Sequence, residues 1–268
     1  MKKLITTIKA IDTESQALPF AVYSSIKEQH LLNVPVVKPL FIAVLDGEKK
    51  LGKDGEIVCC AGDFIFLSDS PAINMRNIPK EKEYFALLIE FEYEDFIGLG
   101  PYSVGEQSFS LGEISIALEK CLQQFVEWSL FSPQALWALR RKEILQLLCH
   151  MGHRDILSMA APHKLGQKIH ALFSQQPSEE VSLAIICQQV AMSESTLRRK
   201  LIAEGTTIQE IKDQVKLGFG LHLVQTTSHS IVYIAEQCGY QSQSRFTSRF
   251  KGRFGLTPSE LRKTKVTD

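Results

Sequence analysis

Two stretches near the C-terminus place cationic, amide and hydroxyl side chains at spacings that suit contact with double-stranded DNA. In the first, Ser195, Arg198, Arg199 and Ile202 recur at the spacing of one helix face. The second has a polar face made of Gln243, Ser244, Arg245, Thr247, Ser248, Arg249 and Lys251. Amides and hydroxyls can hydrogen-bond to base edges, and cations can hold phosphates. The chemistry indicated is binding of a nucleic acid.

The first stretch lies on the second helix of a predicted helix-turn-helix unit, residues 182–204. Ser182 and Ser193 can each cap a helix, and Ala191-Met192 forms the short break between them. The residues expected to be buried are Leu183, Ile186, Cys187, Val190, Leu197 and Leu201. A helix with its apolar residues on one side and adjacent arginines on the other is suited to a major groove.

The second stretch lies in a similar predicted unit, residues 230–254. Ser230 and Ser242 are the expected caps, Gly239 ends the first helix with left-handed backbone, and Gly255 ends the second. The residues expected to be buried are Ile231, Ile234, Ala235, Cys238, Phe246, Phe250 and Phe254. Two capped pairs with cationic second helices favour DNA binding over a generic helical bundle.

Between the two units, residues 207–226 are expected to form a connecting helix. Its predicted inward residues are Ile208, Ile211, Val215, Phe219 and Leu223. Gly218 and Gly220 should each weaken it by up to about 1 kcal/mol relative to alanine. The connector matters because two recognition helices reach successive major-groove faces only when they are held roughly 34 Å apart.

The second unit resembles the signature of the AraC/XylS transcription regulators. The matching residues are Ile234-Ala235, Cys238-Gly239-Tyr240, Ser242-Gln243-Ser244-Arg245-Phe246, Phe250-Lys251, Phe254-Gly255 and Thr257-Pro258. The first unit resembles the same family over Met192 to Leu201 and over Glu204-Gly205-Thr206. Its sequence is similar to that of the branch containing acid-stress and virulence-gene activators. The resemblance covers Lys164 to Lys263, and the N-terminal half resembles the family's cupin-like domain only in pattern.

The resemblance implies roles for the polar residues. It implies base contacts from Ser195, Arg198, Arg199, Gln243, Ser244, Thr247 and Ser248, with Arg245 and Lys251 nearer the phosphates. Thr196, Lys200 and Arg249 are further candidate phosphate contacts. The chain departs from the family at Lys216, Gly218 and Gly220, where an arginine and alanines often stand. Ser248 occupies a place that can hold a longer side chain, so the second unit could read fewer bases, or mostly shape.

The composition indicates a globular chain with one large domain or two smaller ones. Of its 268 residues, 44% are hydrophobic and 22% are charged, which excludes a disordered tail, a fibrous repeat and a membrane bundle. The formal net charge is zero, but the part from Lys164 onward holds 14 basic and 9 acidic residues. This basic C-terminal part is compatible with a nucleic-acid partner.

The N-terminal half carries strand signals. Short apolar runs at 41–45, 56–60, 63–67 and 84–91 are separated by turn residues, which predicts a small β-barrel or sandwich. Apolar residues then recur at helical spacing from Glu113 to Phe131, and a second helix follows Ser132-Pro133. These helices either pack on the β-domain or form a self-association face.

The predicted organisation is α+β with two domains. A cupin-like effector or dimerisation domain occupies 1–155, with a β-barrel and two packing helices. A linker around Ala160-Ala161-Pro162 occupies 156–163, and an all-α AraC-type domain with two helix-turn-helix motifs and a connecting helix occupies 164–268.

The predicted barrel could hold an apolar ligand. Its candidate lining is Phe41, Ile42, Val44, Phe64, Phe66, Phe85 and Leu87, of which strand alternation lets only some face the interior. Lys27 or Lys38 could pair with a fatty-acid carboxylate, since the resemblance includes regulators controlled by fatty acids and others controlled by a protein partner. The alternative is an ordinary packed core in a domain that only dimerises or docks another protein.

Several motifs fail to support catalysis or nucleotide binding. Residues 47–53 fit the spacing of a phosphate loop, but Asp54 replaces the serine or threonine that would bind magnesium and a strand follows, so a lysine-rich hairpin is favoured. A metal-dependent cupin enzyme needs clustered histidines, and His30 is the only histidine before His150. We interpret His150 and His153 as a solvated helix end.

The cysteines and the chain ends favour a cytoplasmic protein. The six cysteines show no C-x-x-C spacing and are expected to be reduced core residues. The sequence shows neither a signal peptide nor an apolar run long enough to cross a membrane.

The sequence therefore predicts a regulator of transcription, more an activator than a repressor, that binds promoter DNA and works with RNA polymerase. No catalytic residue, metal or cofactor is expected. The helix from Glu113 to Phe131 is the candidate dimer face. Two alternatives stay open: an adaptor that acts through protein partners and binds DNA weakly, and a cupin enzyme with an accessory helical domain.

Overall fold

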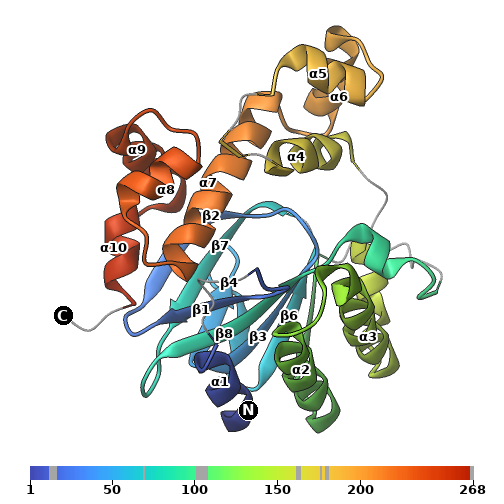
Figure 1. Ribbon diagram of the computed structural model, residues 1–268, viewed down its shortest axis with the longest axis vertical. Coiled ribbons are helices and arrows are strands. Elements are labelled where there is room, and N and C mark those ends of the chain that lie inside the picture. Colours follow the sequence, from blue (N-terminus) through green and yellow to red (C-terminus); the bar gives the residue numbers. More distant parts are fainter. Residues whose placement is uncertain are drawn as a thin grey trace. The chain divides into compact units, whose positions relative to one another are not determined.

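A computed structural model describes residues 1–11, 17–68, 70–100, 108–160, 164–175, 177–178 and 181–265. Contacts divide the chain into two compact units: Met1–Ala161 together with Lys263–Asp268, and Pro162–Arg262. Among the described residues the strands belong to the first unit, and the helices α4 to α10 form the second (Figure 1). The expected α+β architecture with two domains is confirmed.

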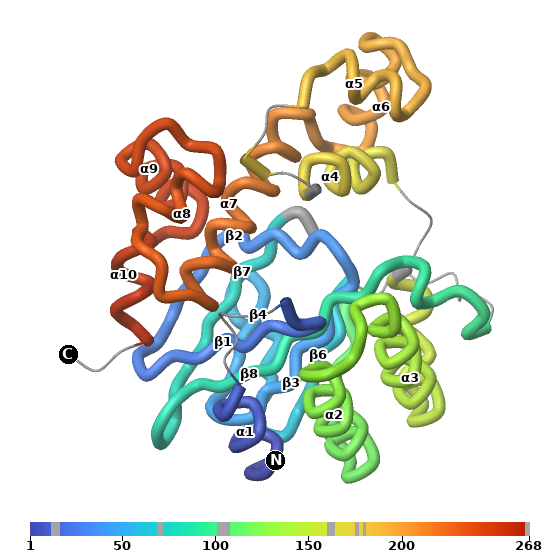
Figure 2. The backbone as a smooth tube through the Cα atoms, viewed as in Figure 1, coloured from blue at the N-terminus to red at the C-terminus, as the bar shows by residue number. Residues whose placement is uncertain are grey.

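The first unit contains two antiparallel sheets, and the chain, which can be followed as a tube in Figure 2, passes back and forth between them. Five strands in the order β1-β8-β3-β6-β9 form one sheet, and β2-β7-β4-β5 form the other. Their bounds are β1 (Ala21–Ser25), β2 (Gln29–Val36), β3 (Leu40–Asp46), β4 (Glu48–Leu51), β5 (Ile57–Cys60), β6 (Asp63–Leu67), β7 (Ser70–Ile78), β8 (Tyr84–Glu90) and β9 (Phe109–Glu113).

The four predicted strands correspond to β3, β5, β6 and β8, whose apolar residues are nearly continuous. The prediction missed β1, β2, β4, β7 and β9. In β2 and β4 buried and more exposed residues alternate, so no apolar run marks them. Their place is set by pairing with distant strands, as in the register Lys49↔Asn77 between β4 and β7.

The five-stranded sheet is buried on both faces, and this corrects the predicted barrel lining. Phe41, Phe64, Phe66, Phe85 and Leu87 all pack into a core with the helices of the first unit, so they line the outer, helix-covered face. Ile42 and Val44 are equally buried but lie on the opposite face, because side chains alternate along a strand.

The helix-covered core is completed by α1 (Lys2–Lys9), α2 (Ile116–Ser129) and α3 (Trp137–His150). Figure 1 shows α2 and α3 beside the sheet. Ser115 caps α2, and the stripe of Leu118, Leu122, Phe125 and Val126 is buried. The apolar stripe of the predicted 113–131 helix is thus used within its own domain. Exposed apolar residues remain at its ends, with Ile116 80% and Phe131 75% exposed.

The segment after α3 differs from the sequence interpretation. Residues Arg154–Ala160 form a 3-10 helix, η3. Its Ile156, Leu157 and Met159 are buried in the helix-covered core of the first unit, so this part of the predicted linker is packed into that unit. Residues 161–163 lie outside the described part of the chain. His153 is also not solvated as expected: its ring packs edge-on against Phe64, 5.0 Å between centroids.

The second unit consists of short helices around a longer one. Their bounds are α4 (Leu165–Gln175), α5 (Leu183–Gln189), α6 (Glu194–Ala203), α7 (Ile208–Thr226), α8 (Ile231–Gln237), α9 (Gln243–Phe254) and α10 (Pro258–Lys263). The four predicted caps are confirmed, because Ser182, Ser193, Ser230 and Ser242 each accept a backbone N–H in the first turn. Gly239 and Gly255 take the predicted left-handed conformation, with φ of 70° and 83°.

The connecting helix α7 packs on different partners along its length. Ile211 and Val215 join a core with Leu197 and Leu201 of α6, as predicted. Phe219 and Leu223, however, are only half-buried. The buried residues of the second half are Leu217, Gly220, Leu221, Val224 and Gln225. The prediction extended one stripe along the whole helix, whereas the helix must present a second face to α8.

Gly220 allows the close approach between α7 and the second helix-turn-helix unit. A Cβ atom at this position would lie 2.8 Å from the Phe246 ring and 3.2 Å from Cys238 Sγ. These distances are shorter than ordinary van der Waals contact, and both neighbours are fully buried. Helix propensity predicts that this glycine weakens the connector, but the packing requires it.

We expect Gly220→Ala to destabilise the second unit by about 1–2 kcal/mol, because overpacking outweighs the gain in helix propensity of about 1 kcal/mol. Gly252→Ala is the matched control: nothing lies within 4 Å of its added Cβ, so it should stabilise α9 by a few tenths to about 1 kcal/mol. Circular dichroism at 222 nm during urea unfolding measures both. Equal stabilisation by the two alanines would contradict the close-packing argument.

Candidate nucleic-acid interface

The first candidate recognition helix, α6, has the two-sided character that DNA contact requires. Leu197 and Leu201 are buried against the domain core, which fixes the rotation of the helix about its axis. The residues Ser195, Arg198, Arg199 and Lys200 are exposed, and Thr196 is half-buried. The structure thus places the predicted residues of the first unit on one accessible helix.

The cations of α6 differ in what they already contact. Arg198 forms an ion pair with Glu194 one turn earlier, with Nη2 2.8 Å and Nε 2.9 Å from Glu194 Oε1. Arg199 and Lys200 have no ion pair among the described residues. Arg199 is therefore available for a bidentate contact, whereas Arg198 must share its guanidinium or leave Glu194.

Hydroxyls form a small cluster at the N-terminus of α6. Ser193 Oγ accepts the Thr196 N–H and also donates to Thr196 Oγ1, 3.0 Å away. Its distance to Ser195 Oγ is 3.3 Å. The cap orients the two predicted contact residues, and the positive end of the helix dipole adds to the attraction for a phosphate.

The second candidate recognition helix, α9, is oriented by its aromatic face. Phe246, Phe250 and Phe254 are fully buried, with neighbouring ring centroids 5.5 and 4.6 Å apart. The exposed predicted residues are Gln243, Ser244, Arg245, Ser248, Arg249 and Lys251, and Thr247 is half-buried. The amide and hydroxyls that could read bases lie on the same helix as the cations.

Arg249, a predicted phosphate contact, joins α9 to α7. Its Nη2 lies 2.8 Å from Asp213 Oδ2, and Gln209 Nε2 donates to Asp213 Oδ1 at 3.1 Å. Arg245 and Lys251 have no ion pair among the described residues. Arg249 therefore also helps to hold the recognition helix against the connector, a role that its place in the sequence did not predict.

Two further residues that the sequence analysis did not assign hold the helices together. Lys216 Nζ, nearly buried, donates to the Gly239 carbonyl at 3.2 Å and lies 5.9 Å from the Tyr240 ring centroid. Glu204 accepts the N–H groups of Leu165 and Gly166, both at 2.8 Å, at the start of α4. The signal for Lys216 was its position among apolar residues of the connector, and Glu204 had no local signal.

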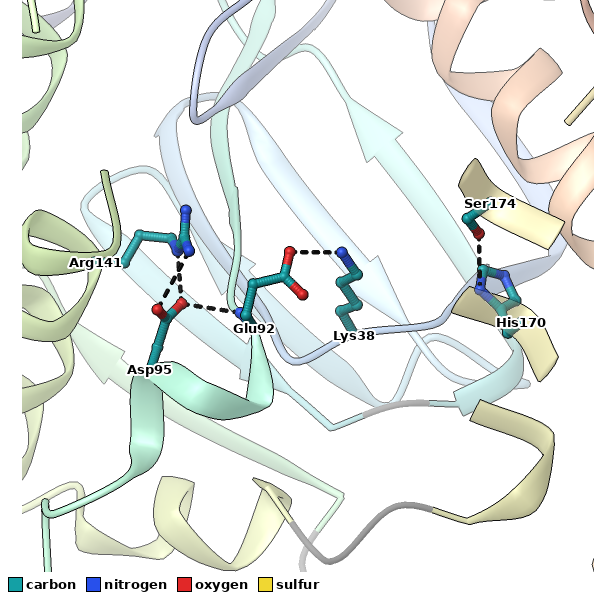
Figure 3. Close-up of polar contacts among 6 residues, drawn as sticks. All are labelled: Lys38, Glu92, Asp95, Arg141, His170 and Ser174. Carbon is teal, nitrogen blue, oxygen red and sulfur yellow. Dashed lines mark hydrogen bonds and ion pairs between the residues drawn. The ribbon is translucent and has the colours of Figure 1, made fainter. Parts of the chain in front are cut away.

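The structure does not bring the two candidate ligand lysines into a common contact. Lys38 Nζ is 2.6 Å from Glu92 Oε1, and the Glu92 backbone is in turn fixed by Asp95, which pairs with Arg141 (Figure 3). Lys27 is exposed, and its backbone N–H donates to the Thr264 carbonyl at 3.2 Å. A ligand carboxylate at Lys38 would have to compete with Glu92.

The remaining reactive groups do not form a catalytic arrangement in the described part of the chain. Among those residues no group of three or more His, Cys, Asp or Glu could hold a metal ion. Cys59, Cys121 and Cys238 are buried as expected, but Cys60 is exposed. Burial raises the pKa of the Cys59 and Cys238 thiols to about 12, which keeps them protonated. None of the described helices has the length and apolar character needed to cross a membrane.

The comparisons with known proteins agree with this geometry. A family model described as a helix-turn-helix domain matches residues 186–264. The urease operon transcriptional activator of Escherichia coli is 30% identical over 36% of the chain and 32% of that protein. The transcriptional regulator GadX of Escherichia coli O127:H6 is 29% identical over 66% of the chain and 81% of its own length. These matches identify residues 186–264 as a helix-turn-helix domain of the kind found in AraC/XylS transcription regulators.

The N-terminal half shares its fold with a regulator of known structure. The crystal structure of ToxT from Vibrio cholerae with an unsaturated fatty acid bound covers 93% of this chain and 96% of its own, at 17% identity and a TM-score of 0.64. A second crystal form of ToxT gives a TM-score of 0.68. The family is one of regulators, not of enzymes. The chain spans about a third of the urease operon activator.

We expect Glu194→Gln to tighten DNA binding several-fold at low salt, because it removes a negative charge from α6 and releases Arg198. One additional cation should also steepen the dependence of log K on log salt by up to about one. Fluorescence anisotropy with a labelled duplex at several salt concentrations measures both. In an Arg198→Ala background the added steepness should disappear, and its persistence would show that Arg198 is not the cation released.

Proposed function

We propose that this chain is a sequence-specific transcriptional regulator, more an activator than a repressor, that binds promoter DNA in the cytoplasm and acts with RNA polymerase. The observation that carries the proposal is the pairing of two capped helix-turn-helix units. In each, a buried apolar stripe leaves a polar, cationic helix exposed. Both helices belong to a domain that matches a helix-turn-helix family model.

The connector supports simultaneous use of both recognition helices. With 19 residues, α7 is about 28 Å long at 1.5 Å per residue, close to the roughly 34 Å between successive major-groove faces. The packing at Gly220 and the Asp213–Arg249 ion pair connect it to the second unit. We therefore assign base reading to Ser195, Arg198, Arg199, Gln243, Ser244, Thr247 and Ser248, and phosphate contact to Thr196, Lys200, Arg245, Arg249 and Lys251.

Control through the N-terminal domain forms the second part of the proposal. The effector is a small apolar ligand such as a fatty acid, and the support is the shared fold with ToxT, whose crystal structure holds an unsaturated fatty acid. The competing effector is a protein partner or a second copy of the chain. Ile116, Phe131 and Leu139, between 64% and 80% exposed near α2 and α3, favour such a contact.

An adaptor with weak DNA binding would show no sequence preference, whereas the proposed regulator should bind one kind of site selectively. Genomic fragments captured by the purified full chain should share an asymmetric site of roughly two helical turns. Retitration of the best site against a shuffled duplex should give a ratio of at least about 10³ at physiological salt. Equal affinity for both duplexes, with and without added fatty acid, would favour the adaptor.

Within such a site we expect Arg199→Ala to cost about 1–3 kcal/mol and to relax the preference at one base pair, as loss of a bidentate guanine contact would. Lys251→Ala is the matched comparison: it should weaken all duplexes alike and lower the salt slope by about one. Competition titrations with single-base variants of the site separate the two. A uniform loss for Arg199→Ala would reassign that arginine to the phosphates.

A further inference from the structure

A polar cluster lies buried within the first unit, at a place that the ligand hypothesis from the sequence did not consider. Lys49 on β4, Asn77 on β7 and Gln29 on β2 belong to the four-stranded sheet, and each is at most 2% exposed. The sequence predicts a lysine-rich hairpin at Lys49. The hairpin is present as β4 and β5, but Lys49 faces the interior, whereas the half-buried Lys50 lies on the opposite face of the strand.

The acceptors of this cluster are already used. Lys49 Nζ donates to Asn77 Oδ1 at 2.7 Å, and Asn77 Nδ2 donates to Gln29 Oε1 at 2.8 Å. Gln29 Nε2 then donates to Thr264 Oγ1 at 2.7 Å. Each side-chain amide therefore accepts one hydrogen bond through its oxygen and donates another through its nitrogen.

The five-stranded sheet adds two buried hydroxyl groups. Tyr84 on β8 and Ser25 on β1 are register partners and are at most 1% exposed. Both hydroxyls are buried without a hydrogen bond among the described residues. The Lys49 ammonium lies 5.5 Å from the centroid of the Tyr84 ring. The cluster thus draws on both sheets of the sandwich.

The cluster has a surplus of donors and of positive charge. An ammonium has three donor hydrogens, and one of those of Lys49 is satisfied by Asn77. No carboxylate of the described residues pairs with Lys49. Burial lowers the pKa of Lys49 to about 8, so the amine is still mostly protonated at pH 7. Nearby Cys59 and Tyr84, whose pKa values burial raises, are neutral there.

A buried, unpaired cation beside unpaired hydroxyls is costly unless an acceptor joins them. The group that matches this donor set is planar, anionic and rich in acceptors. From this we infer that Lys49, with the hydroxyls of Tyr84 and Ser25, is the binding site for the carboxylate of a small organic acid inside the β-sandwich. The inference rests on the proposed control through the N-terminal domain and replaces Lys27 and Lys38 as the carboxylate partners.

The test is calorimetric titration of the full chain at pH 7 with acetate, decanoate and inorganic phosphate. We expect a carboxylate to bind saturably, decanoate in preference to acetate if the ligand carries an apolar chain. Lys49→Met, which replaces a buried cation by an apolar side chain of similar length, should lower the affinity at least ten-fold. Tyr84→Phe removes only a hydroxyl without a partner, so it should leave folding intact and weaken binding several-fold.

Lys50→Met is the control, because it removes a lysine from the outer face of the same strand. Unchanged carboxylate affinity in Lys49→Met with a retained circular dichroism spectrum would overturn the site. Absence of saturable binding by all three anions would also overturn it, and the cluster would then be a hydrated part of the core. DNA titration of the same proteins separates this failure from that of the proposed function. If the protein prefers a DNA sequence but binds no carboxylate, the proposed regulator function stands and the carboxylate site at Lys49 is rejected.

Discussion

The burial of one apolar stripe on each recognition helix is the constraint on which the candidate DNA interface depends. Three phenylalanines one turn apart fix α9, and Leu197 with Leu201 fixes α6. Once these stripes are buried, the helices cannot rotate, and their polar residues must face solvent. Burying a side chain of this size contributes about 1.5–3 kcal/mol, far more than any of the exposed contacts on the same helices. Packing therefore orients the surface that we assign to DNA.

The cations on that surface differ in whether an acidic side chain already pairs with them. Arg198 and Arg249 are held by Glu194 and Asp213, whereas Arg199 and Lys251 have no ion pair among the described residues. Exposed pairs of this kind contribute only about 0.2–1 kcal/mol each, so a phosphate or a guanine can displace them. Their effect is to restrain long side chains before DNA arrives, and Arg249 additionally connects α9 to the connector α7.

The two faces of the five-stranded sheet in the N-terminal unit have different surroundings. One face packs its phenylalanines against α1, α2 and α3 and forms an apolar core. The opposite face looks into the space between the two sheets. There the Lys49 ammonium and the hydroxyls of Tyr84 and Ser25 are buried among apolar neighbours. A domain that needed only stability would have little use for such a group, since each unpaired donor in it opposes folding. This cost is the physical reason for treating it as a site.

The sequence by itself determined the features that arise from neighbours within one or two helical turns. Serine caps, left-handed glycines and the spacing of Phe246, Phe250 and Phe254 are local, and they located both helix-turn-helix units and their polar faces. The tertiary structure alone decided which face each strand presents to which neighbour and where α7 changes its buried side. It also turned Lys49 inward and made Gly220 a packing contact. These outcomes depend on partners far away in the chain, such as Asn77 for Lys49 and Phe246 for Gly220, and no local pattern specifies them.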